Sequence, residues 1–116
     1  MSSAEMAMLE GRFDCDLGVE HFFAGGVYAR KMEIPQGFRA GSHAHKYAHL
    51  SILARGVVRL TRDGGESYIL RAPACISMLA DTYHTVEAIE SSIWYCVHAT
   101  DERDVSKIDE VLIVRS

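Results

Sequence analysis

The chain is poor in the features that mark several large classes of protein. Three of its 116 residues are cysteine, and their wide spacing without a C-x-x-C pair argues against a disulfide framework or a thiolate zinc site. No apolar run approaches the roughly 20 residues of a membrane-spanning helix, and the first ten residues lack the regions of a signal peptide. We therefore expect a cytoplasmic protein that does not bind membranes and keeps its cysteines reduced and buried.

A concentration of positive charge is also missing. The 12 lysines and arginines are scattered along the chain, and the formal net charge is −4, so we expect no binding to nucleic acid. Hydrophobic residues at 48% and charged residues at 24% are ordinary for a globular protein. A chain of this length encloses one core, which predicts one domain with one pocket for a small-molecule substrate or ligand.

Short runs rich in β-branched and aromatic residues dominate the chain from Gly25 onward. Turn residues separate these runs about every ten positions, as is typical of an all-β sandwich or barrel. Asp63-Gly64-Gly65 predicts a tight hairpin that pairs residues 57–62 with residues 66–71. We expect residues 1–24 to form an N-terminal arm or peripheral strand, and residues 25–116 to form a single barrel domain. The predicted strands are 27–34, 43–54, 57–62, 66–71, 75–79, 82–89, 92–99 and 111–114.

Three histidines, His43, His45 and His49, fall within seven residues. On a strand, side chains alternate between faces, so offsets of two and six place all three imidazoles on one face. On a helix, His43 would lie about 200° from His45, so the three imidazoles would not share one face. A single buried histidine is more often a hydrogen-bonded core residue, but three at this spacing favour a site for Mn, Fe, Ni, Zn or Cu, which neutral imidazole binds well.

The same alternation suggests further residues of the pocket. Tyr47 shares the face of His49, which makes it a candidate for the pocket wall. Arg30 could place a cation in the cavity to hold a substrate carboxylate, or it could cover apolar surface with its stem. His98 could face the same cavity or cap the end of a strand. We interpret His21, which precedes the main run of strands, as structural or solvated.

The histidine segment resembles the first motif of the cupin superfamily, G-x5-H-x-H-x3-E-x6-G. Gly37, His43, His45, His49 and Gly56 follow this spacing at every step, with histidine at position 49 where most members have glutamate. The second cupin motif is matched only loosely, by residues 79–84, and ends at residue 88 on alanine rather than asparagine.

This resemblance implies an antiparallel cupin barrel, that is, a jelly roll or double-stranded β-helix. It also implies His84 as a fourth metal ligand beside His43, His45 and His49, as in the small four-histidine, manganese-type cupins. The resemblance favours a metal-dependent oxidoreductase of dioxygenase type acting on a small, oxygen-rich organic substrate. A metal-dependent isomerase or lyase on a sugar-derived or keto acid, and a non-catalytic small-ligand binder or sensor, remain open.

Two apolar residues on the opposite side of the histidine strand, Leu50 and Ile52, need cover. A homodimer that packs sheet on sheet would supply this cover, and so would an overlying N-terminal segment.

Overall fold

The computed structural model describes residues 18–41, 47–62, 65–80 and 82–108, and strands dominate this part of the chain. No helix among these residues is long and apolar enough to cross a membrane. The strands are β1 (Glu20–Ala24), β2 (Val27–Ile34), β3 (Arg39–Gly41), β4 (His49–Arg55), β5 (Val57–Arg62), β6 (Ser67–Arg71), β7 (Ala74–Met78), β8 (His84–Ala88) and β9 (Ser92–Ala99).

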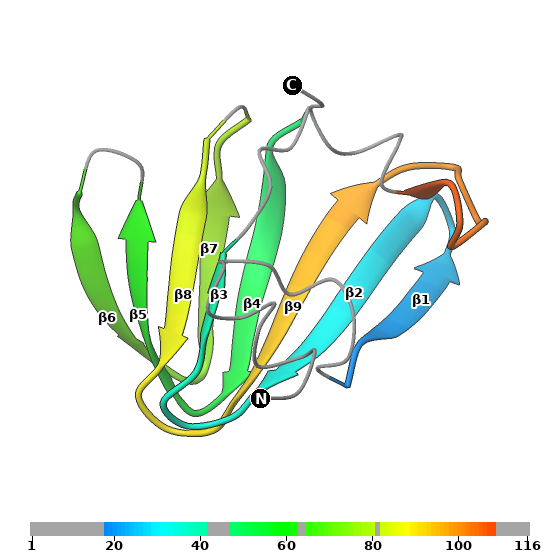
Figure 1. Cartoon of the computed structure of the whole chain (residues 1–116). Coiled ribbons are helices and arrows are strands. Elements are labelled where there is room, and N and C mark those ends of the chain that lie inside the picture. The colour runs from blue at the N-terminus through cyan, green and yellow to red at the C-terminus, as the bar shows by residue number, and fades with distance from the viewer. Residues whose placement is uncertain (1–17, 42–46, 63–64, 81, 109–116) are drawn as a thin grey trace.

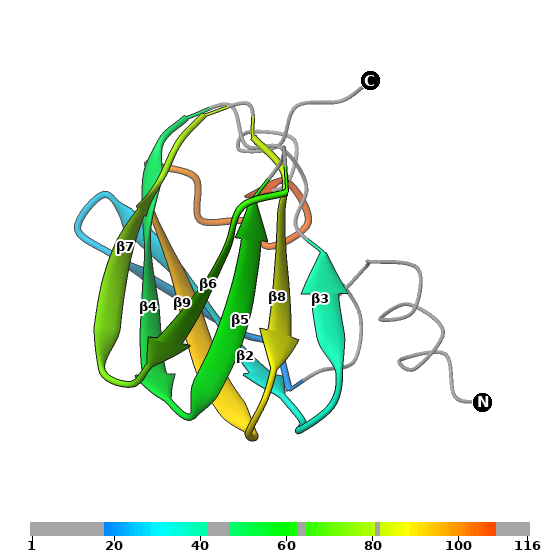
Figure 2. The same cartoon turned by 90° about the vertical axis from the view of Figure 1, so that its left-hand side faces the viewer.

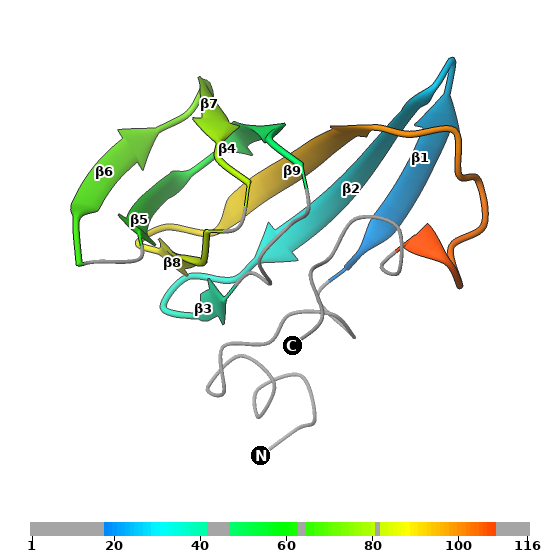
Figure 3. The ribbon, with the colours of Figure 1, turned by 90° about the horizontal axis from the view of Figure 1, so that it is seen from above.

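The strands form two antiparallel sheets that face each other (Figure 1; Figure 2). One sheet has the order β1-β2-β9-β4-β7, and the other has the order β3-β8-β5-β6. The view from above in Figure 3 shows the two layers meeting at an angle, with β1 and β2 extending beyond the smaller sheet. The chain thus has the all-β, jelly-roll arrangement predicted from its sequence.

The described strands do not close into a barrel, which corrects one detail of the prediction. No ladder joins the two sheets within the described ranges. The chain passes from β6 to β7 through Pro73, which has no N–H with which to continue a ladder. The result is an open, two-layered jelly roll.

Several predicted strands occur in the structure with the predicted bounds or close to them. Strands β2, β5 and β9 match the prediction at both ends, and β5 pairs with β6 as the hairpin signal required. The N–H of Gly65 donates to the carbonyl of Arg62 at 2.9 Å, and Gly65 takes a φ of +93°, which glycine adopts readily. Local turn chemistry was therefore sufficient to predict this hairpin.

Other strands differ from the prediction. Strand β3 was not predicted, because three residues that include a glycine carry no alternating pattern. Of the predicted strand 43–54, residues 43–46 lie outside the described residues, residues 47 and 48 are not in a strand, and β4 begins only at His49. The predicted strand 111–114 also lies outside the described residues. Residues 20–24 form β1, an edge strand that pairs with β2.

The core lies between the two sheets and is built from the inward residues of facing strands. Trp94 and Leu53 of the larger sheet pack with Val58 and Leu60 of the smaller one, and all four are at most 2% exposed. A second, smaller cluster joins Tyr28, Ile108 and Phe23.

Gly56 of the first motif has a clear structural role between β4 and β5. Its φ is +94°, and a Cβ added there would collide with the side chain of Ser92 and the backbone of Ser91. Gly37 also has a positive φ, +85°, although the space around it is open. The matching glycines of the motif are therefore turn residues, and Gly56 also allows a close approach of two chain segments.

Candidate metal centre

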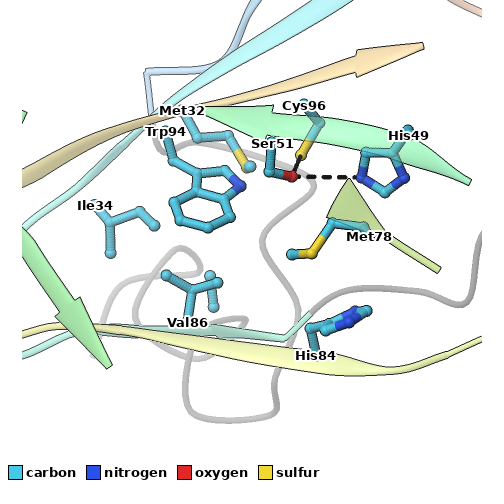
Figure 4. Close-up of a pocket in the computed structure, with 10 residues that line it drawn as sticks. Met32, Ile34, His49, Ser51, Met78, His84, Val86, Trp94 and Cys96 are labelled. Carbon is cyan, nitrogen blue, oxygen red and sulfur yellow. Dashed lines mark hydrogen bonds between the residues drawn. The ribbon is translucent and has the colours of Figure 1, made fainter. Parts of the chain in front are cut away.

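Two of the predicted ligands, His49 and His84, face each other across the two sheets (Figure 4). His49 is the first residue of β4, and Ser51 and Leu53, which share its face, are fully buried. His84 is the first residue of β8 and is 6% exposed, and Val86 shares its inward face. Both strands start at the same end of the molecule, so their first side chains meet at one mouth (Figure 1).

A small cavity lies below these two imidazoles. Its free space of about 20 Å³ admits one ion or water molecule, so an organic ligand has to bind at the mouth rather than inside. The lining is otherwise mostly apolar. It consists of Met32, Ile34, Ala40, His49, Ser51, Met78, His84, Val86, Trp94 and Cys96.

The imidazole of His49 is held in its neutral form. Burial, followed by the nearby His84, lowers the pKa of His49 from 6.5 to about 4. A neutral imidazole keeps a lone pair available for a metal at physiological pH. The donor chemistry of this pair therefore fits a divalent transition metal.

Hydroxyl groups lie beside both imidazoles. The Oγ of Ser51 is 3.5 Å from Nε2 of His49, and Oγ1 of Thr82 is 3.5 Å from Nε2 of His84. Thr82 also donates a hydrogen bond of 2.8 Å to the carbonyl of Leu79, which orients its hydroxyl. The sequence analysis assigned no role to Ser51 or Thr82.

The cysteines differ from each other in environment. Cys96 is buried as predicted, and burial raises the pKa of its thiol, which keeps it protonated and unsuited as a metal ligand. Cys75 was also predicted to be buried, but it is exposed, because it lies on the outward face of the edge strand β7. Cys15 lies outside the described residues.

The remaining two predicted ligands, His43 and His45, also lie outside the described residues. Within the described ranges, no group of three or more histidine, cysteine, aspartate or glutamate side chains is arranged to hold a metal ion. The structure thus places two members of the predicted four-histidine set, one on each sheet.

His98 lies beside this pair, on the inward face of β9. It is 4% exposed, and its ring stacks on the ring of His49 with a centroid distance of 4.2 Å. On its other side it stacks on Tyr28 at 6.1 Å. His98 thus faces inward and restrains the His49 ring, but it does not line the small cavity.

Arg30 faces inward but belongs to the second cluster rather than to the cavity wall. Its Nε donates to the hydroxyl oxygen of Tyr28 at 2.8 Å, and this oxygen lies 2.7 Å from Nδ1 of His21. Of the two interpretations of His21, structural or solvated, this contact favours the structural one. Tyr47 is 58% exposed, precedes β4 and does not line the cavity.

Comparisons with known proteins agree with this fold. No family model and no curated protein sequence matches the chain. Among solved structures, a cupin 2 domain-containing protein from Halorhodospira halophila superposes with a TM-score of 0.64 at 15% identity, covering 86% of this chain and 80% of that one.

A second cupin-2 domain protein, from Shewanella frigidimarina, gives a TM-score of 0.60 at 9% identity over 75% of this chain and 84% of that one. The FeII form of HppE in complex with substrate gives 0.61 at 9% identity, covering 73% of this chain and 55% of that one. At such low identity the likeness concerns the fold and not the activity. The chain therefore has the jelly-roll fold of the cupins.

Proposed function

We propose that this protein binds one divalent transition metal through His43, His45, His49 and His84. The observation that supports this proposal is the pair of imidazoles, the half-buried His49 and the buried His84, that the two sheets bring to one mouth. Imidazole donors suit Mn, Fe, Ni, Cu and Zn, and the low pKa of His49 keeps one of them ready to bind.

We further propose that the metal site serves an oxidoreductase of dioxygenase type that acts on a small, oxygen-rich organic substrate. When bound, such a metal binds dioxygen or polarises a chelating oxygen donor. The residues of the chain restrict access: Met78 and Trp94 exclude bulk water from the cavity, and the substrate remains at the mouth. His98 keeps the His49 ring in place through stacking. The FeII named for the HppE neighbour is consistent with redox chemistry on this fold.

A non-catalytic ligand binder is the second candidate, and one observation favours it. Among the described residues that line the cavity, none is a carboxylate that could act as a general acid or base. Oxygen consumption by the metal-loaded protein, measured with small hydroxy and keto acids, separates the two. Uptake that follows added substrate supports the oxidoreductase, and tight binding without uptake supports the binder.

Metal binding itself is tested by elemental analysis of untagged protein purified without added metal. We expect about one equivalent in the wild type, lost in His49→Ala and His84→Ala but retained in the control His21→Ala. Trp94, the single tryptophan, lines the cavity, so quenching of its fluorescence by added Mn²⁺ gives an independent titration. Failure of the wild type to hold or take up metal would show that the proposal is wrong.

We also propose a homodimer that packs through the outward face of the larger sheet. The register aligns Phe22, Ala29, Val97 and Leu50 in one row across four strands, and Phe22 and Leu50 are 48% and 46% exposed. Lys31 on this face pairs with Glu20 at 3.2 Å, which offsets its charge in the proposed interface. A two-fold axis makes such a face complementary to itself.

Sedimentation tests this assembly. We expect a dimer for the wild type and a monomer for Leu50→Lys. A monomeric wild type would refute the dimer. A dimer that persists in Leu50→Lys would show that another surface mediates it.

A further inference from the structure

A cationic residue stands beside His84 on the smaller sheet: Arg62, the last residue of β5. It lies directly opposite His84 in the β5–β8 ladder. It shares the face of Val58 and Leu60, both of which are buried in the core. By the alternation of a strand, Arg62 therefore projects on the same side of the sheet as His84 and at the same end.

The contacts of Arg62 hold its charge in place without neutralising it. Its guanidinium carbon lies 5.5 Å from the centre of the Tyr68 ring, a cation–π distance. Glu66, the acid nearest in sequence, accepts a hydrogen bond of 2.7 Å from the hydroxyl of Tyr68. The ion pairs of the described part of the chain join Lys31 to Glu20 and Glu33, and Arg59 to Glu87, so none of them uses Arg62.

One donor of this guanidinium is also unsatisfied. Nε of Arg62 is buried and has no hydrogen-bond partner among the described residues. A buried donor without a partner destabilises the folded protein, and an incoming acceptor would remove this penalty. A guanidinium offers several donors in a planar fork that matches the oxygens of a carboxylate.

Arg30, the arginine that the sequence analysis considered, has no such unsatisfied Nε. Its Nε is already engaged by the hydroxyl of Tyr28, on the larger sheet. The cation placed beside His84 is thus Arg62, which the sequence analysis did not single out. The sequence does show that Arg62 shares a strand face with residues 58 and 60. This places Arg62 next to His84 only once β8 is known to pair with β5.

We propose that Arg62 is the anion-recognition residue of this site and selects ligands that carry a carboxylate or an enolate oxygen. The anionic group binds the guanidinium at the mouth, and a neighbouring oxygen of the same molecule reaches the metal held by the histidines. Binding of the second oxygen to the metal rests on the proposed metal site, whereas binding of the anionic group to Arg62 does not.

The experiment uses glycolate, a small hydroxy acid with both groups, and the Mn²⁺-loaded protein. Binding is measured by isothermal titration calorimetry for the wild type, Arg62→Gln, Arg62→Lys and Arg59→Gln. Arg59 is a matched control because it lies on the same strand but faces outward and is exposed, 3.7 Å from Glu87. We expect Arg62→Gln to weaken glycolate binding at least about tenfold, as the loss of a charge-assisted hydrogen bond predicts. We expect a smaller loss in Arg62→Lys and a change below twofold in Arg59→Gln.

The affinity for Mn²⁺, measured separately, distinguishes this inference from the metal proposal. We expect Arg62→Gln to bind Mn²⁺ at least as tightly as the wild type, because a cation next to the site is removed. Similar glycolate affinities in the wild type and Arg62→Gln, or undetectable binding in the wild type, would overturn the inference. If the wild type takes up no metal, the metal proposal fails, and the same titration on the metal-free protein decides the anion subsite: binding lost in Arg62→Gln supports it, and no binding overturns it.

Discussion

Stacking of His98 on His49 makes a quantitative prediction about metal affinity. The two ring centroids are 4.2 Å apart with an interplanar angle of 27°, and His98 is buried. A stacked ring pair contributes about 0.5–1.5 kcal/mol beyond its buried area. Because the stack restrains an imidazole that we propose as a metal ligand, we expect His98→Ala to raise the Kd for Mn²⁺ by about 2- to 12-fold.

The matched variant is His98→Phe, which keeps an aromatic ring but removes the nitrogens. If His98 acts through stacking, this variant should stay within about twofold of the wild type, with the affinity followed by quenching of Trp94 fluorescence. Equal and complete loss of binding in both variants would refute the reasoning, since it would make His98 a ligand. An unchanged Kd in His98→Ala would show that the stack does not position His49.

Three further predictions concern stability. Leu53→Ala, which truncates a fully buried side chain in the core, should lower the free energy of unfolding by about 2–5 kcal/mol in urea titrations, and a loss below 1 kcal/mol would contradict the packing described here. Gly56→Ala should destabilise by more than about 1 kcal/mol, because φ is +94° and the new Cβ meets Ser92, and wild-type stability would refute this steric argument. The folded state depresses the pKa of His49 to about 4, so only the unfolded chain gains a proton there as the pH falls from 6.5 towards 4. The metal-free protein should therefore lose stability over this window, and His49→Gln should show a flatter pH profile. Equal slopes for the two proteins would contradict the assignment.

Local patterns in the sequence were sufficient for much of the fold. The strands β2, β5 and β9 have strong β-branched and aromatic runs that end at turn residues, so their bounds could be predicted. The three-residue strand β3 could not, because its pairing with β8 and not its own residues makes it a strand. The open edge between the sheets was also missed, since sheet closure depends on ladders between strands that are distant in sequence.

Some features of the candidate site could likewise be predicted from the sequence, and others could not. The alternation of a strand from His49 onward places Ser51 and Leu53 on its face, and both are buried. Tyr47, expected in the pocket wall by the same parity, is exposed because the alternation of β4 begins only at His49. The ligand assignments of His43 and His45 stay predictions, as both residues lie outside the described part of the chain.

The sequence by itself determined the class of the fold, the hairpin between β5 and β6, and the alternating faces of β4, β8 and β9, because these depend on neighbours a few residues apart. Only the tertiary structure decided that His84 and Arg62 stand side by side, that His98 stacks on His49, and that Arg30 belongs to another cluster. The first two of these contacts join strands separated by tens of residues. The physical reason is that strand pairing depends on the packing of the whole molecule, which no local pattern encodes.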